Sequence, residues 1–219
     1  MTERVLDWKP RFDTRSLGHK VSLAYALERP LRARIWKRTV WLDQGSEGAC
    51  VGFSCAHEMA LTPRRWSPEY TEQMARVLYR EAQKRDQWAG ESYEGSSVLG
   101  GMQALKDRGE IKSYRWCTTV EEVLWAVSYI GPVVIGVNWY AGMFAPDANG
   151  HLHTKGRLAG GHAIVIGGID PKNERVLLYN SWGKGWGKDG AAWLSFAELD
   201  RLLHEDGEFA VPLKTRLVV

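Results

Sequence analysis

The sequence predicts an α+β protein of two lobes, because helical patterns fill the first half of the chain and short strand patterns fill the second. The strand patterns are rich in β-branched and aromatic residues and are bounded by glycine, proline or asparagine. The pattern changes near residues 113–117. We therefore expect an N-terminal extension (1–40) that packs on the lobes, a helical lobe (41–114) and a β-rich lobe (115–219). The expected helices are residues 50–61, 67–84, 97–109 and 118–131, and the expected strands are 133–139, 162–169, 175–182 and 190–196.

Two of these helices have local start signals. Ser67 is a good cap for the second helix, since Pro68 suits the first helical position and Glu69 places a carboxylate in the first turn. Thr118 and Glu121 have the spacing of a capping box, so the fourth helix is expected to begin at Thr118.

The composition is that of an ordinary globular protein and excludes several classes. Hydrophobic residues make up 44% and charged residues 25% of the 219 positions, and the net charge of +3 is too small to indicate binding to nucleic acid or membranes. No apolar run reaches the roughly 18 residues of a membrane span, and the first residues show no signal-peptide pattern. The three cysteines, Cys50, Cys55 and Cys117, form no disulfide framework. We expect a cytoplasmic protein with free thiols.

Cys50 opens the first predicted helix, directly after a loop that contains Gly45, Gly48 and Ala49. Backbone N–H groups and the helix dipole favour negative charge at such a position. Because the thiolate is the nucleophilic form of cysteine, we expect the pKa of Cys50 to be lowered. Gln44 lies six residues earlier and can bring its side-chain N–H groups near the cysteine. A donor there would stabilise the oxyanion of an acyl-transfer intermediate, an effect of about 3 to 4 kcal/mol.

A cysteine nucleophile needs a base, and His162 is the histidine whose context suits that role. Only this one of the six histidines opens a strand pattern directly after a double glycine, Gly160-Gly161. A histidine at the start of a strand, with glycine beside it, projects from a rigid sheet into a space with room for a partner. We therefore expect His162 to form a thiolate–imidazolium pair with Cys50.

Asn180 and Trp182 lie in the glycine-rich segment YNSWGKGWG, residues 179–187. The Asn180 side chain can accept a hydrogen bond from one imidazole nitrogen, which fixes the tautomer and directs the other nitrogen at the cysteine. Trp182 can cover that hydrogen bond and keep water away from it, which strengthens the bond in a low-dielectric pocket.

These three segments resemble the signature blocks of the papain family of cysteine peptidases. The first is DQGSEGACVGFS (43–54), the second begins GGHA (160–163), and the third, NSWGKGWG (180–187), matches almost letter for letter. Ser67-Pro68-Glu69-Tyr70 resembles the second-helix start of short bacterial and viral members. The resemblance implies a helical lobe and a β-barrel-like lobe with the active-site cleft between them.

The resemblance also implies substrate-binding positions and shows three departures. Gly95 and Ser96 fall where the family has an extended segment that hydrogen-bonds the substrate backbone, and we add Gly161 and Trp182 to the expected substrate-binding residues. Glu47 stands where secreted relatives have a disulfide-bonded cysteine. Val51 stands where many relatives have tryptophan. About 40 residues precede the signature region, fewer than the usual inhibitory propeptide. Self-cleavage, a separate inhibitor and confinement to a virus particle all remain open as restraints on activity.

The expected function is hydrolysis of peptide bonds in peptide or protein substrates through Cys50, His162 and Asn180, with Gln44 in the oxyanion hole. Two alternatives remain: an acyl or peptidyl transferase or cell-wall peptide amidase with the same triad, and a catalytically silent papain-like module used for binding or structure. No cofactor is expected. No metal site is expected either, since His151 and His153 have no obvious third ligand. The oligomeric state is not predicted.

Overall fold

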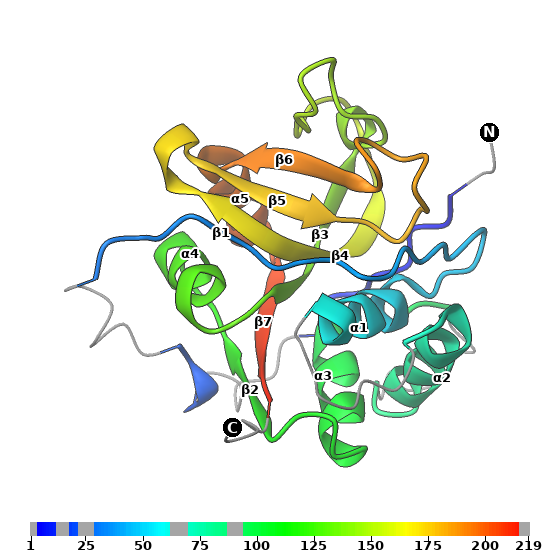
Figure 1. Ribbon diagram of the computed structural model, residues 1–219. Coiled ribbons are helices and arrows are strands. Elements are labelled where there is room, and N and C mark those ends of the chain that lie inside the picture. Colours follow the sequence, from blue (N-terminus) through cyan, green and yellow to red (C-terminus); the bar gives the residue numbers. More distant parts are fainter. Residues whose placement is uncertain (1–3, 12–17, 22–28, 62–69, 87–93, 215–219) are drawn as a thin grey trace.

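The computed structural model describes residues 4–11, 18–21, 29–61, 70–86 and 94–214 of the 219-residue chain. Figure 1 labels the helices and strands, which follow one another in the order β1-α1-α2-α3-β2-α4-β3-β4-β5-β6-α5-β7. The helices are α1 (Cys50–Leu61), α2 (Glu72–Gln83), α3 (Val98–Asp107), α4 (Val120–Tyr129) and α5 (Phe196–His204). The strands are β1 (Arg34–Ile35), β2 (Ser113–Trp116), β3 (Val133–Tyr140), β4 (Leu158–Asp170), β5 (Arg175–Tyr179), β6 (Ala191–Ser195) and β7 (Glu208–Leu213).

One antiparallel sheet joins all of these strands. Its order is β2-β7-β3-β4-β5-β6, and β1 pairs with the far part of β4. Strand β4 is the longest, with 13 residues, and it pairs with β3 on one side and with β5 on the other. Helices α1 to α3 pack on one side of this sheet and α4 and α5 on the other (Figure 1). The sheet therefore fixes the position of both helical groups relative to β4.

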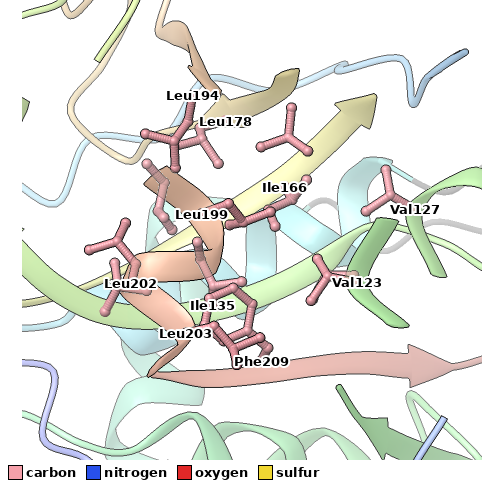
Figure 2. Packing of buried hydrophobic residues seen from close by; sticks show 14 of the residues in the cluster. Val123, Val127, Ile135, Ile166, Leu178, Leu194, Leu199, Leu202, Leu203 and Phe209 are labelled. Carbon is pink, nitrogen blue, oxygen red and sulfur yellow. The ribbon is translucent and has the colours of Figure 1, made fainter. Parts of the chain in front are cut away.

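Alternation along the strands creates two hydrophobic clusters, one on each face. In β3, Ile135 faces the cluster with α4 and α5, and its neighbour Val134 faces the cluster with α1 to α3. In β4, Ile166 and Val165 divide in the same way, as expected for strands whose successive side chains point to opposite faces. Figure 2 shows the first cluster. Its labelled residues are Val123, Val127, Ile135, Ile166, Leu178, Leu194, Leu199, Leu202, Leu203 and Phe209.

The α+β class is confirmed, and the first helix begins at Cys50 as predicted. The cap assigned to the fourth helix was wrong by one residue. Thr119, rather than Thr118, accepts from the Glu122 backbone N–H, and the Glu122 carboxylate accepts in return from the Thr119 backbone N–H. The Glu122 carboxylate also accepts from the Thr118 hydroxyl, so the threonine beside the cap contributes to the same motif.

The second helix begins later than predicted. It starts at Glu72, where the Thr71 side chain accepts from the backbone N–H of Met74, and the expected cap at Ser67 lies outside the described residues. Strands β1, β2 and β7 and helix α5 were not predicted. The division of the chain into units at residues 40 and 114 stays a prediction. Among the described residues, no helix is long and apolar enough to cross a membrane.

Candidate active site

Helix α1 places Cys50 at its first position, against strand β4. The side chain is completely buried, and the backbone N–H groups of Asp7, Val51 and Ala163 donate hydrogen bonds toward its sulfur. Ala163 follows His162 in β4, so the thiol lies beside the predicted base. Close packing of α1 on α2 fixes this position, because a Cβ on Gly52 would lie 2.3 Å from the backbone oxygen of Ala75.

The predicted lowering of the Cys50 pKa is wrong for this conformation. Burial raises the pKa of the thiol to about 11, although the surrounding backbone N–H groups oppose the rise. The helix start does supply donors, but they do not offset the loss of water around a charged sulfur.

His162 lies inside β4 and forms a short hydrogen bond with Asn180. The strand begins at Leu158, so His162 is its fifth residue, opposite Val137 of β3, and the prediction that it opens the strand was wrong. The distance from His162 Nε2 to Asn180 Oδ1 is 2.9 Å, and both side chains are buried. The imidazole is therefore positioned by the middle of strand β4, which carries it, and by Asn180, which follows strand β5.

The hydrogen bonds of Asn180 determine which imidazole nitrogen carries the proton. Asn180 Oδ1 also accepts from the backbone N–H of Ser181 at 2.8 Å, which identifies this atom as the oxygen. An oxygen that only accepts requires His162 Nε2 to donate. The lone pair of the neutral ring then lies on Nδ1, which has no hydrogen-bond partner among the described residues. Burial lowers the pKa of His162 to about 4 and the bond to Asn180 opposes that shift, so the ring is neutral here.

Aromatic rings enclose the His162–Asn180 bond. The centroid of the Trp182 ring lies 4.8 Å from that of His162, tilted by 33°, and Trp139 contacts the same imidazole edge-on at 4.8 Å. The Phe144 ring stacks on the Trp182 ring, with a centroid distance of 5.7 Å and an interplanar angle of 15°. Trp182 is 3% exposed and packs against the imidazole; its role in excluding water stays a prediction.

Gln44 is buried and held in one orientation by Ser181. The Ser181 hydroxyl donates to Gln44 Oε1 at 2.8 Å, and the Gln44 backbone N–H donates to the Ser181 carbonyl at 2.9 Å. The amide nitrogen of Gln44 is thereby turned toward the carbonyls of Glu47, at 2.8 Å, and Val5, at 3.4 Å. Sequence reasoning missed Ser181, although it lies inside the Asn-Ser-Trp segment.

Residues 4–11, which we call the N-terminal strap, cross this site. The strap is hydrogen-bonded to two separate segments: the Trp8 backbone N–H donates to the Gly161 carbonyl of β4 at 2.9 Å, and the Ser96 backbone N–H donates to the Asp7 carbonyl at 3.1 Å. The absence of a side chain at Gly95 allows this segment and the strap to approach so closely, because a Cβ there would lie 2.0 Å from the Asp7 carbonyl oxygen. In Figure 1 the strap is the dark blue trace that leads from the N-terminus to behind α1. The predicted substrate-binding residues Gly95, Ser96 and Gly161 thus contact a segment of their own chain.

The Trp8 side chain fills a pocket that ends at a buried carboxylate. Its indole nitrogen donates to Glu208 Oε2 at 2.8 Å, and the backbone N–H of Val98 donates to the same oxygen at 2.8 Å. The absence of a side chain at Gly136 makes room for the ring, since a Cβ there would lie 2.1 Å from the indole nitrogen. Burial raises the pKa of Glu208 to about 7. No sequence signal connected these two residues.

Comparison with known proteins supports the fold assignment. The chain aligns with structures of xylellain, a cysteine protease from Xylella fastidiosa (TM-score 0.74, 14% identity, 96% of both chains) and of procathepsin L 3 from Tenebrio molitor larval midgut (TM-score 0.60, 14% identity, 96% of this chain and 76% of that one). It also aligns with bromelain from Ananas comosus in complex with the E64 inhibitor (TM-score 0.57, 16% identity, 85% of this chain and all of that one). The chain has the papain-like fold.

Sequence relatives agree with this papain-like assignment, and no family model matches the chain. Cathepsin B-like cysteine proteinase 3 of Caenorhabditis elegans is 25% identical over 177 residues, which cover 79% of this chain and 42% of that protein. Cathepsin B-like cysteine proteinase 3 of Ostertagia ostertagi is 34% identical over 80 residues, 36% of this chain and 46% of that protein. The chain spans less than half the length of these relatives. The resemblance to the papain family is confirmed; the likeness to short bacterial or viral members stays a prediction.

Cys55, Cys117, His57 and His153 lie in other surroundings than the His162–Asn180 pair. Cys55 and Cys117 are buried free thiols. His57 is buried against Tyr179, and burial lowers its pKa to about 3, so its role is structural. His153 contacts Asp147 at 3.1 Å, and no group of three or more metal-ligating side chains occurs in the described part of the chain.

Proposed function

We propose that this chain is a cysteine peptidase that hydrolyses peptide bonds with Cys50 as nucleophile and His162 as base. The observation that carries the proposal is the hydrogen bond from His162 Nε2 to Asn180 Oδ1, because it leaves the lone pair of Nδ1 as a proton acceptor. The backbone contact between Cys50 and Ala163, the neighbour of His162, supports the pairing of thiol and imidazole.

The proposed reaction is acyl transfer to sulfur followed by hydrolysis. Cys50 gives its proton to His162 Nδ1, and the thiolate attacks the carbonyl carbon of the substrate. The oxyanion accepts hydrogen bonds from the Gln44 amide and the Cys50 backbone N–H. The imidazolium then protonates the leaving amine as the C–N bond breaks, which gives a thioester. Water, deprotonated by His162, attacks the thioester and releases the carboxylic acid and the thiol.

Asn180 and Trp182 support this cycle by holding the imidazole. Asn180 Oδ1 accepts from Nε2 in both the neutral and the charged ring, so the ring keeps its orientation while the proton moves at Nδ1. The cover of Trp182 over His162 keeps water from competing for that bond.

The substrates are peptides or proteins bound in an extended form. Ser96 and Gly161 have backbone groups that already pair with the extended strap, and the same groups are available to a substrate backbone once the strap leaves. No side-chain preference is proposed.

The test is mass mapping combined with turnover. An epoxide inhibitor of cysteine peptidases should give a single adduct on Cys50, and Cys50→Ala should lower peptide hydrolysis by about four orders of magnitude or more while the melting temperature is kept. Cys117→Ala is the matched control, because it removes a buried free thiol in the other hydrophobic cluster and should leave turnover unchanged. Appreciable hydrolysis by Cys50→Ala refutes the nucleophile assignment.

An added amine separates hydrolysis from the transferase alternative. If the acyl group passes mainly to the amine at concentrations far below that of water, the chain is a transferase. If no peptide is cleaved and the epoxide does not label Cys50, the catalytically silent alternative holds.

A further inference from the structure

The loop before helix α1 is attached to helix α2 by charged side chains. We call residues 43–49 the oxyanion loop, since they contain Gln44, the proposed oxyanion donor. Glu72 begins α2, and its carboxylate accepts from the Asp43 backbone N–H at 3.2 Å. No disulfide holds this loop, because all three cysteines of the chain are free thiols. Its position therefore depends on non-covalent contacts.

Arg76 makes the second charged contact, one helical turn further along α2. Its Nε lies 2.8 Å from Oε1 and 2.9 Å from Oε2 of Glu47, in the oxyanion loop. Its Nη1 lies 3.6 Å from the Glu72 carboxylate. The guanidinium also lies over the Phe53 ring of α1, 5.5 Å from the ring centroid. Arg76 therefore connects the oxyanion loop, α2 and α1 in one network.

The main chain of Glu47 links this network to Gln44. The Glu47 carbonyl accepts from Gln44 Nε2 at 2.8 Å, and the Glu47 backbone N–H donates to the Gln44 carbonyl at 3.1 Å. Both the side chain and the backbone of the glutamine thus depend on the position of Glu47. Ser181 holds Gln44 Oε1 from the other side, but it does not contact the amide nitrogen that acts as the donor. Movement of Glu47 would therefore carry that nitrogen with it.

We propose that Arg76 and Glu72 are positioning residues of the peptidase: their ionic network with Glu47 keeps the oxyanion loop, and with it the Gln44 amide, where the donor meets the transition state. Neither residue touches a reacting atom. The inference rests on the proposed function, because Gln44 has a catalytic role only there. It adds a form of regulation to that function, since it makes turnover depend on ionic strength.

The network is open to salt. The side chains of Arg76, Glu47 and Glu72 are 33%, 47% and 45% exposed. Dissolved ions screen such charges, because the Debye length falls from about 8 Å at physiological ionic strength to about 3 Å at 1 M. An exposed ion pair contributes little by itself, whereas several charges in one network contribute measurably. The expected effect on turnover is therefore a few-fold change rather than orders of magnitude.

The experiment compares Arg76→Gln with Arg85→Gln in the full chain. Arg85 provides a matched control, because it lies just after the other end of α2 and also pairs with two carboxylates. One belongs to Glu81, a helical turn earlier, and the other to Asp107 at the end of α3, so both lie outside the oxyanion loop. Two properties are measured: kcat and KM for a fluorogenic peptide mixture, and hydrogen exchange of the backbone N–H groups of the oxyanion loop.

We expect Arg76→Gln to lower kcat by about threefold to fivefold with little change in KM, because the oxyanion donor acts in the transition state and not in substrate binding. Glu47→Gln should lower kcat to the same extent, and both substitutions together should cause no further loss, since they break one contact. Hydrogen exchange of the oxyanion loop should become faster in all three variants. Arg85→Gln should change neither kcat nor this exchange.

Salt provides a second test that leaves the parent protein unaltered. Raising NaCl to about 1 M should lower the kcat of the parent and of Arg85→Gln toward that of Arg76→Gln. The kcat of Arg76→Gln itself should hardly change, because its network is already broken. A purely structural role of Arg76 would alter the melting temperature but would not produce this difference in salt dependence.

The outcomes separate the inference from the proposed function. If Arg76→Gln leaves the exchange of the oxyanion loop or the kcat unchanged, or if Arg85→Gln loses as much kcat, the network does not position the donor and the inference is wrong, although the peptidase activity stands. If exchange becomes faster in Arg76→Gln and not in Arg85→Gln, but neither the parent nor any variant cleaves peptide, the network does hold the loop and the proposed function fails.

Discussion

Ser181→Ala should lower peptide hydrolysis through its effect on Gln44, although Ser181 touches no reacting atom in the proposed mechanism. The Ser181 hydroxyl donates to Gln44 Oε1 at 2.8 Å between two side chains that are each 1% exposed. Without the hydroxyl, Gln44 Oε1 is buried and has no donor, which costs about 1 to 3 kcal/mol. The amide can recover part of this only by turning, which would carry its nitrogen away from the oxyanion position.

The expected loss is smaller than that of removing the donor itself. Gln44 Nε2 keeps its bond to the Glu47 carbonyl at 2.8 Å, and the backbone bond between Gln44 and Ser181 also survives in the variant. Both contacts oppose rotation of the Gln44 side-chain amide. We therefore expect kcat to fall about 10-fold in Ser181→Ala, against about 10²- to 10³-fold in Gln44→Ala.

The assay is steady-state hydrolysis of a fluorogenic peptide mixture by the parent chain and the variants. The fall should appear in kcat with little change in KM, because the hydroxyl touches no substrate. Ser128→Ala is the matched control, since Ser128 is also buried and its hydroxyl makes one hydrogen bond, to the Arg32 carbonyl. Adding Ser181→Ala to Gln44→Ala should cause no further loss. A kcat within twofold of the parent, or fully additive losses, would refute the positioning role.

Two further predictions concern buried polar groups. Asn180→Ala removes the acceptor that fixes the His162 tautomer, so kcat should fall by about 10- to 100-fold, as for a lost buried bond of roughly 1 to 3 kcal/mol; an unchanged kcat would contradict that role. Glu208 is surrounded by the Trp8 indole, backbone N–H groups of the strap and α3, and the Asp86 carboxylate, and burial raises its pKa to about 7. The folded chain then holds this proton more tightly than the unfolded chain, so the stability from Glu208 is present below about pH 4.5 and is lost as the pH rises through about 7. Glu208→Gln should flatten the fall in melting temperature between about pH 5 and pH 8, and an unchanged slope would show that another group titrates.

Much of the fold follows from local patterns in the sequence. Helix α1 begins at Cys50 because a small-residue loop gives way to an apolar helical pattern there. Strand β5 begins at Arg175 as predicted but ends at Tyr179, three residues before the predicted end, so Asn180 lies directly after the strand. Caps and periodicity depend on neighbouring residues, and they place elements to within a few positions. The cap at Thr119 shows the limit, because two adjacent threonines both contact Glu122: the Thr118 hydroxyl donates to its carboxylate, whereas the Thr119 hydroxyl accepts from its backbone N–H.

The position of His162 required the sheet. A double glycine before a histidine suggested a strand start, but β4 runs through these glycines because they pair with Trp139 and Asn138 of β3. Pairing with a partner strand overrides the weak strand preference of glycine. Sequence spacing identified the imidazole; only the register of two strands determined which neighbours hold it.

By itself the sequence determined which residues carry the candidate chemistry: the cysteine at a helix start, the histidine, the asparagine and the glutamine. Only the tertiary structure decided their state. Burial raises the pKa of Cys50 where the helix start alone predicted a lower one. A contact of the N-terminal strap joins Trp8 to Glu208, 200 residues apart in the chain. No local pattern encodes such a contact, because it forms only when the pocket beneath Gly136 has been assembled from the sheet and α3.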